Sequence, residues 1–248
     1  MSDSNLNNSR FGFSTGALER GDYAKAVSWM EHQHIQSIEL SALRYDELAP
    51  MIEHLDCLDL RHFSYISFHA PSSFSREQES RVLELLKRVS NRGWNIIVHP
   101  DVIYTPSLWA FLGEHLLIEN MDRRKPIGRT AEELNDIFQR LPQARLCLDI
   151  AHARQMDTTL TSLWEIIRLY FDRIAEIHIS ELDSSYRHRP MSEGAVSAYR
   201  KLANHLDGHI HVIIESMLDR QYASLRMEEL DLARQALNAK SEPANIRK

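Results

Sequence analysis

Residues 115–122 read HLLIENMD. The first four residues form a short, mostly apolar run, and the carboxylate of Glu119 follows directly after it. A run of this length between helical stretches is typical of a strand. We therefore predict a strand at 115–118 with an acidic side chain at its carboxyl end.

The same kind of run recurs on both sides of this stretch. We predict further strands at 11–14 (FGFS), 35–40 (IQSIEL), 65–68 (YISF), 95–98 (NIIV), 145–148 (RLCL), 174–179 (IAEIHI) and 210–214 (IHVII). Helical spacing of apolar residues predicts amphipathic helices at 22–33, 76–89, 130–138, 160–170, 196–206 and 224–237. In the third of these, Thr130 followed by Glu133 predicts a capping box.

Eight strands that alternate with helices in 248 residues favour the α/β class, as a single (β/α)8 TIM barrel. We place the barrel domain at residues 10–240 and expect flexible tails at 1–9 and 241–248. An open doubly wound sheet is the alternative. That fold usually has a glycine-rich first turn, whereas only Ser14-Thr15-Gly16 follows the first predicted strand.

Composition argues against several function classes. The formal net charge of −6 gives no basic field for a nucleic-acid partner. The two cysteines, Cys57 and Cys147, are too few for a disulfide framework or a cysteine-based zinc site. The polar N-terminus lacks the apolar stretch of a signal peptide, and no apolar run is long enough to span a membrane, so we expect a cytoplasmic protein.

Potential metal ligands stand at the carboxyl ends of the third to eighth predicted strands, where a TIM barrel carries its active site. They are His69, His99, Glu119, Asp149 with His152 three positions later, His178 and Glu215, and His188 follows in the loop after the seventh strand. A single histidine of this kind is more often a structural residue, but six consecutive strand ends exceed chance. Unpaired carboxylates are costly to bury, and a divalent cation removes that cost. Imidazole and carboxylate ligands without thiolate suit Zn²⁺, Mn²⁺ or Fe²⁺ better than Ca²⁺.

Over about residues 11–217, the chain resembles the xylose isomerase-like TIM-barrel superfamily, which includes endonuclease IV and many sugar isomerases and epimerases. The motifs that carry the resemblance are FHAP (68–71), VHP (98–100), IEN (118–120), LDIAHA (148–153), IHIS (177–180), RHRPMSEG (187–194) and IIE (213–215). Their order along the chain makes the resemblance more specific than any one motif does.

The two branches of the superfamily imply different metal sites. The isomerase branch implies one ion, held by Glu119, Asp149, His178 and Glu215. The endonuclease IV branch adds an ion at His69, His99 and a bridging Glu119, and a third at His152 and His188. Endonuclease IV has an aspartate two residues before that last histidine, where this chain has Tyr186. Asp183 and Glu181 are the candidate replacements.

The ligand set implies a metal-dependent hydrolase of a phosphoester with two or three ions per chain, in which Glu119 and Glu215 are catalytic. We expect a small-molecule substrate that carries phosphate. Nucleic acid is less favoured because of the net charge, and because Pro71–Phe74 is the only candidate wedge for a duplex. An arginine fork binds phosphate through two oxygens. The expected substrate-binding side chains are Glu39, Arg123, Arg124, Arg187 and Arg189.

Two alternatives stay open. One is a single-metal sugar or sugar phosphate isomerase or epimerase, in which Glu119 and Glu215 exchange protons across the sugar while His69 and His99 bind its hydroxyls. The other is a barrel that has lost catalysis and serves as a binding module, which the complete set of ligands disfavours.

Overall fold

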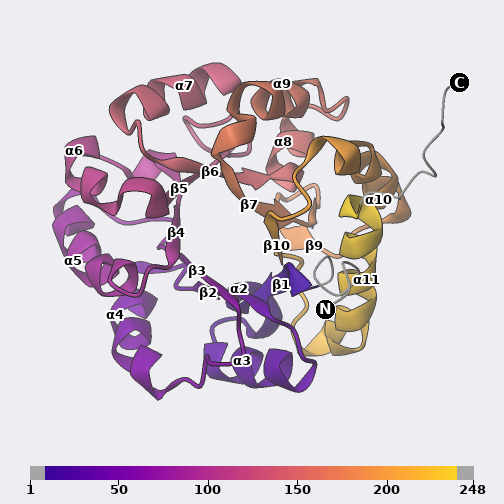
Figure 1. The fold of residues 1–248 in the computed structure, drawn as a ribbon, viewed down its shortest axis with the longest axis horizontal. Coiled ribbons are helices and arrows are strands. Elements are labelled where there is room, and N and C mark those ends of the chain that lie inside the picture. The colour runs from indigo at the N-terminus through magenta and orange to yellow at the C-terminus, as the bar shows by residue number, and fades with distance from the viewer. Residues whose placement is uncertain (1–8, 239–248) are drawn as a thin grey trace, which may run out of the picture.

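In residues 9–238, the part of the chain that the computed structural model describes, eight parallel strands close into a barrel surrounded by helices (Figure 1). The barrel strands are β1 Phe11–Ser14, β2 Ser37–Ser41, β3 Tyr65–His69, β4 Asn95–Val98, β5 Leu116–Glu119, β6 Arg145–Asp149, β7 Ile174–Ile179 and β10 His211–Ile214. Their order round the barrel is β1-β10-β7-β6-β5-β4-β3-β2. The predicted (β/α)8 TIM barrel is confirmed.

The predicted tails lie outside the described residues, apart from Ser9. The carbonyl of Ser9 accepts a hydrogen bond from Ser37 Oγ at 2.9 Å. None of the helices that the structure describes has the length and apolar character needed to cross a membrane.

Helices cover the outside of the barrel. The α-helices are α2 Thr15–Glu19, α3 Tyr23–His32, α4 Tyr45–His54, α5 Glu79–Ser90, α6 Pro106–Trp109, α7 Ala131–Arg140, α8 Ile150–Met156, α9 Thr161–Tyr170, α10 Glu193–Tyr199 and α11 Arg226–Leu237. The 3-10 helices are Leu55–Cys57, Arg76–Gln78, Pro100–Val102, Ala110–His115, Phe171–Arg173, Arg200–His205 and Arg220–Leu225. Sequence periodicity does not predict α2, α4, α6 or α8. Three of these are too short to show a period, and α4 contains Pro50.

The predicted capping box of α7 is only half correct. Thr130 Oγ1 accepts a hydrogen bond from the backbone N–H of Glu133 at 3.2 Å, as expected. The Glu133 carboxylate instead accepts from the backbone N–H of Arg129 at 2.7 Å and pairs with the Arg129 guanidinium. A charge-assisted contact is stronger than a neutral one, so the carboxylate turns to the arginine.

Strand alternation explains why the predicted ligands point into the barrel. A small buried cluster lies inside it, made of Ile97, Leu117, Cys147 and Ala175. Successive side chains of a strand point to opposite faces, so a residue two positions further along points the same way. His99, Glu119 and Asp149 each stand two positions after a member of this cluster. A polar layer therefore lies directly above the apolar one.

A short antiparallel hairpin follows β7 and is not predicted from the sequence. It pairs β8 Glu181–Leu182 with β9 His188–Arg189, and its turn contains Tyr186 with a φ of 60°. The hairpin places His188 beside the carboxyl ends of β7 and β10, as its contacts with Ser180 and Glu215 show.

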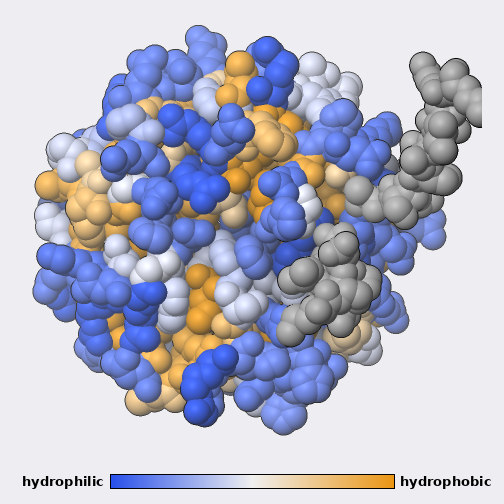
Figure 2. All heavy atoms as spheres, in the orientation of Figure 1, coloured by the Kyte–Doolittle hydropathy of each residue, from blue (hydrophilic) through white to orange (hydrophobic). Residues whose placement is uncertain are grey.

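Figure 2 shows that hydrophilic side chains cover most of the visible face of the molecule, with apolar ones in scattered patches between them.

Candidate metal centre

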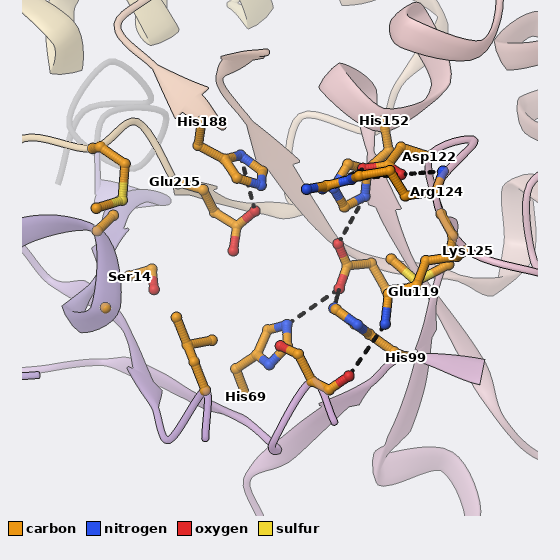
Figure 3. A pocket seen from close by; sticks show the side chains of 16 residues that line it. Ser14, His69, His99, Glu119, Asp122, Arg124, Lys125, His152, His188 and Glu215 are labelled. Carbon is orange, nitrogen blue, oxygen red and sulfur yellow. Dashed lines mark hydrogen bonds and ion pairs between the residues drawn. The ribbon is translucent and has the colours of Figure 1, made fainter. Parts of the chain in front are cut away.

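A cavity of about 440 Å³ opens at the carboxyl ends of the strands (Figure 3). Six of the eight predicted metal ligands line it: His69, His99, Glu119, His152, His188 and Glu215. The other two, Asp149 and His178, lie just beneath it and are buried. The structure therefore brings all eight together, although four lie in barrel strands, two directly follow a barrel strand, and His152 and His188 lie in α8 and β9.

Glu119 lies at the centre of the cluster and is 1% exposed. Its Oε2 lies 3.2 Å from His69 Nε2 and 3.1 Å from His99 Nε2. Its Oε1 lies 3.1 Å from His152 Nδ1 and 3.8 Å from His178 Nδ1. Each oxygen of one carboxylate thus faces a different pair of histidines.

Below Glu119, the ligand atoms of Asp149, His178 and Glu215 all lie within 4.8 Å of it and of one another. His178 Nδ1 is 3.4 Å from Glu215 Oε2. Asp149 Oδ2 and His178 Nδ1 are buried and have no hydrogen-bond partner among the described residues. Orphaned polar atoms are costly to bury. Two such atoms belong to one group of four candidate ligands, which fits a cation site because a bound cation would satisfy both atoms.

Hydrogen bonds from His69 and His152 to backbone carbonyls determine which ring nitrogen of each is available to bind a metal ion. His69 Nδ1 donates to the carbonyl of Ala70 at 2.7 Å, which leaves Nε2 facing Glu119. His152 Nδ1 donates to the carbonyl of Asn120 at 3.0 Å, which leaves its Nε2 free. Such contacts orient histidine ligands and select the tautomer that binds metal.

Asn120 and Asp122 are site residues that the sequence analysis missed, although both belong to the opening motif. Asn120 Nδ2 donates to the carbonyl of Asp149, and its Oδ1 accepts from the Asp149 N–H, both at 2.8 Å. Asp122 is 1% exposed, lines the cavity and has Oδ2 at 3.9 Å from His152 Nε2. Their proximity to Glu119 in sequence was the available signal, but the inward direction of a loop side chain has no sequence period.

A third group joins Asp149, His152 and His188, whose ligand atoms lie within 4.8 Å of one another. The His152 and His188 rings lie 5.4 Å apart, and His188 Nδ1 is 2.7 Å from Ser180 Oγ. Asp149 is the carboxylate of this group, which receives none from position 186 because that residue is Tyr186.

The two replacements predicted for the missing aspartate point elsewhere. Asp183 pairs with Arg187 at 3.1 Å. Glu181 pairs with Arg154 and Arg189, each at 3.1 Å. Neither carboxylate lines the cavity.

The charges of the cluster shift its pKa values strongly. Burial acts to raise the pKa of Glu119, but the charge of His99 and the contacts with the other histidines around it hold that pKa well below its ordinary value. Burial and the charges of Glu215 and Glu119 raise the pKa of Asp149 to about 7. Burial acts to lower the pKa of His152, but Asp149 and Glu119 raise it to about 10. The metal-free cluster therefore holds protons where a cation would otherwise sit.

Three of the four predicted basic residues line one of two adjoining cavities. Arg124 lines the metal cavity, pairs with Asp122 and lies 5.2 Å from the Tyr186 ring. Arg187 and Arg189 line an adjoining cavity of about 400 Å³. Arg124 and His188 line both cavities, which places the second one beside the candidate metal ligands.

Two predicted substrate-binding residues do not reach the cavity. The Arg123 guanidinium donates to the carbonyls of Gln155 and Met156 at 3.3 Å. Glu39 is fully buried and contacts His178 from below. Lys125, adjacent to Arg124, does line the cavity and pairs with Asp101 at 2.9 Å.

Comparisons with known proteins agree with this architecture. An endonuclease IV of Thermus thermophilus matches with a TM-score of 0.60 and 16% identity, over 90% of this chain and 97% of that one. A putative sugar phosphate isomerase/epimerase of Anabaena variabilis matches with a TM-score of 0.52 and 16% identity, over 96% of this chain and 92% of that one. Such identities show the fold alone. No curated protein matches the chain.

The sequence pattern of a known family covers the second half of the barrel. The pattern described as "Xylose isomerase-like TIM barrel" matches residues 109–238, which is more than half of the chain. These residues contain Glu119, Asp149, His178 and Glu215, which form one of the buried ligand groups. The chain therefore belongs to the xylose isomerase-like TIM barrel family.

Proposed function

We propose that this protein is a multinuclear, divalent-metal-dependent hydrolase that acts on a phosphoester. The observation that carries the proposal is the position of Glu119. Its Oε2 faces His69 and His99, whereas its Oε1 faces the group beneath the cavity. A carboxylate that faces two separate ligand sets with its two oxygens is suited to bridge two ions.

The donor set supports this assignment. Each of the three groups around the cavity offers imidazole nitrogens and carboxylate oxygens, which suit Zn²⁺, Mn²⁺ or Fe²⁺. One ion would be held by His69, His99 and Glu119, and a second by Glu119 with the three ligands beneath it. The group of Asp149, His152 and His188 is the candidate for a third.

The chain's own residues would position a phosphoester over this cluster. Bound divalent cations would supply Lewis acidity and neutralise charge on the phosphoryl group. Glu119 and Glu215 would act by holding those cations. Arg124 and Lys125 are placed to bind further phosphate oxygens, because both line the same cavity. Asp122 and Asp101 fix these two basic side chains through ion pairs.

The size and charge of the site favour a small substrate. The cavity volume of about 440 Å³ is that of a small-molecule site. The adjoining cavity adds Arg187 and Arg189, which would contact a second anionic group of the substrate. The net charge of −6 disfavours long nucleic acid as the substrate.

A sugar phosphate isomerase or epimerase is the second candidate function. Glu119 Oε1 and Glu215 Oε2 approach His178 Nδ1 at 3.8 and 3.4 Å. With a single ion held there, Glu119 and Glu215 would be the two carboxylates that exchange protons across a bound sugar phosphate. The Anabaena variabilis structure that shares this fold is named as a putative enzyme of that class.

Metal content and a substrate panel separate the two functions. The full chain is purified without chelator, its metals are counted by elemental analysis, and it is assayed on phosphomonoesters, phosphodiesters and ketose phosphates. We expect two or three ions and phosphoester hydrolysis. One ion with isomerisation of a ketose phosphate would favour the alternative.

A matched pair of variants tests the phosphate contact. Arg124→Ala should raise KM for the phosphoester, because Arg124 lines the cavity. The adjacent Arg123→Ala should not, because that side chain bonds to the carbonyls of Gln155 and Met156 instead. Equal effects of the two substitutions would remove Arg124 from the proposed phosphate site.

A further inference from the structure

His178 is held from the side opposite the candidate metal ligands. Its Nδ1 faces Glu119 and Glu215, whereas its Nε2 lies 2.9 Å from Glu176 Oε1 and 3.1 Å from Glu39 Oε2. His178, Glu39 and Glu176 are all fully buried. One imidazole nitrogen therefore faces two carboxylates inside the barrel.

This arrangement determines how His178 presents itself to a cation. Nε2 carries the proton, because it forms a hydrogen bond with Glu176 Oε1, which can only accept. Glu39 Oε2 lies 3.1 Å from the same nitrogen and accepts no hydrogen bond from the described residues, so its contact with His178 is electrostatic. Nδ1 is then the nitrogen with the free lone pair, and it has no hydrogen-bond partner among the described residues. A carboxylate on the far nitrogen also makes a histidine ligand more basic and fixes the plane of its ring.

Each of the two carboxylates is itself held in place. Glu176 Oε2 accepts a hydrogen bond from the Tyr65 hydroxyl at 2.5 Å, and that hydroxyl accepts from Asn95 Nδ2 at 3.1 Å. No lysine or arginine in the described part of the chain forms an ion pair with Glu176 or Glu39. Among the described residues, His178 is therefore the ion-pair partner of both Glu39 and Glu176.

Glu39 is linked to the cavity by two serines. Ser41 Oγ donates to Glu39 Oε1 at 3.0 Å. Since that hydroxyl has one proton, the contact of 2.6 Å between Ser14 Oγ and Ser41 Oγ must have Ser14 as donor. Ser14 lines the cavity (Figure 3). A chain of hydrogen bonds thus runs from the cavity wall to the underside of His178.

We propose that Glu39 and Glu176 are positioning residues that hold His178 with Nδ1 toward the bound ion. This inference rests on the proposed metal binding and replaces the expected role of Glu39 in substrate contact. Two carboxylates on one imidazole set both the tautomer and the ring orientation. Neither carboxylate touches the substrate.

The test measures metal binding rather than turnover. Zn²⁺ is titrated into the metal-free full chain in competition with a chromophoric chelator, and Co²⁺ replaces Zn²⁺ to give a visible spectrum that reports ligand geometry. Glu39→Gln and Glu176→Gln should each weaken binding of one ion by about 10- to 100-fold and change the Co²⁺ spectrum. The ion at His69 and His99 should bind as before.

Glu79→Gln is the matched control. Glu79 is also buried, and its Oε1 accepts from the N–H groups of Tyr104 and Thr105 and from Trp109 Nε1. It contacts no candidate ligand, so Zn²⁺ affinity and the Co²⁺ spectrum should match those of the unaltered chain. Ser41→Ala removes the hydrogen bond to Glu39 and the contact with Ser14 but leaves both carboxylates in place, so it should give a smaller loss in the same direction. It keeps the inference testable should either glutamine variant fail to fold.

The possible results distinguish a failure of this inference from a failure of the proposed function. If the unaltered chain binds no Zn²⁺, the proposed function fails and the inference fails with it. If the chain binds two ions, and the variants of Glu39, Glu176 and Ser41 that fold bind them with unchanged affinity and spectrum, the positioning role is overturned while the proposed function stands. A loss of affinity equal to that of Glu79→Gln would likewise show a general effect of buried charge.

Discussion

Replacing Glu119 by glutamine should disrupt two ion sites at once. The glutamine side chain keeps the shape of Glu119 but removes its charge and one acceptor oxygen. Both oxygens are in use, Oε2 by His69 and His99 and Oε1 by the group that includes His178. Two ions would therefore each lose part of a shared ligand.

The expected size of the effect follows from these contacts. A charge-assisted contact contributes about 1.5–3 kcal/mol, which corresponds to about 10- to 150-fold in affinity. Each ion loses about one such contact in Glu119→Gln. Both dissociation constants should rise within that range, and the metal content after dialysis against metal-free buffer should fall below one ion per chain.

Equilibrium dialysis with Zn²⁺, followed by elemental analysis, measures both quantities. Circular dichroism confirms that the variant is folded, and Glu79→Gln shows the effect of removing a buried carboxylate elsewhere. A variant that loses one ion and keeps the other at full affinity would assign Glu119 to a single group. Unchanged content and affinity for both ions would refute the bridge altogether.

Three further substitutions or conditions give clear expectations. His69→Ala should remove one ion and leave the group beneath Glu119 filled, by elemental analysis; unchanged metal content with a higher KM for a sugar phosphate would point to isomerase chemistry instead. Gly12→Ala should lower the free energy of unfolding in urea by about 1–3 kcal/mol, because its Cβ would lie 1.8 Å from the Ser37 carbonyl oxygen; a smaller loss would show that β1 and β2 can separate. The pKa of His152 in the metal-free protein is raised from 6.5 to about 10, so its stabilising contribution is complete below pH 6.5 and is lost as the pH rises to about 10. The gain in melting temperature on adding Zn²⁺ should therefore grow over that interval, and a constant gain would contradict the raised pKa.

Strand positions and the direction of the strand-end residues are predictable from the sequence. Short apolar runs mark all eight barrel strands, and β3, β5 and β6 each extend one residue further to include His69, Glu119 and Asp149. Alternation then turns these side chains inward, because the period of a strand is two residues.

Loop and helix residues near the site are less predictable. Arg123 and Arg124 are neighbours in sequence, yet one bonds to the backbone of the last two residues of α8 and the other lines the cavity. Their directions depend on the acceptors that the folded chain offers, such as the carbonyl of Gln155. No local period encodes such a choice.

The sequence alone therefore determined the barrel and the positions of the candidate ligands at the strand ends, since both follow from local patterns along each strand. Only the tertiary structure decided that the two oxygens of Glu119 face different histidines, that Asp122 lies beside His152, and that Glu39 lies beneath His178 rather than in the cavity. Those contacts join side chains from strands and loops far apart in sequence. Barrel closure brings them together, and the cost of burying unpaired charge then selects their partners.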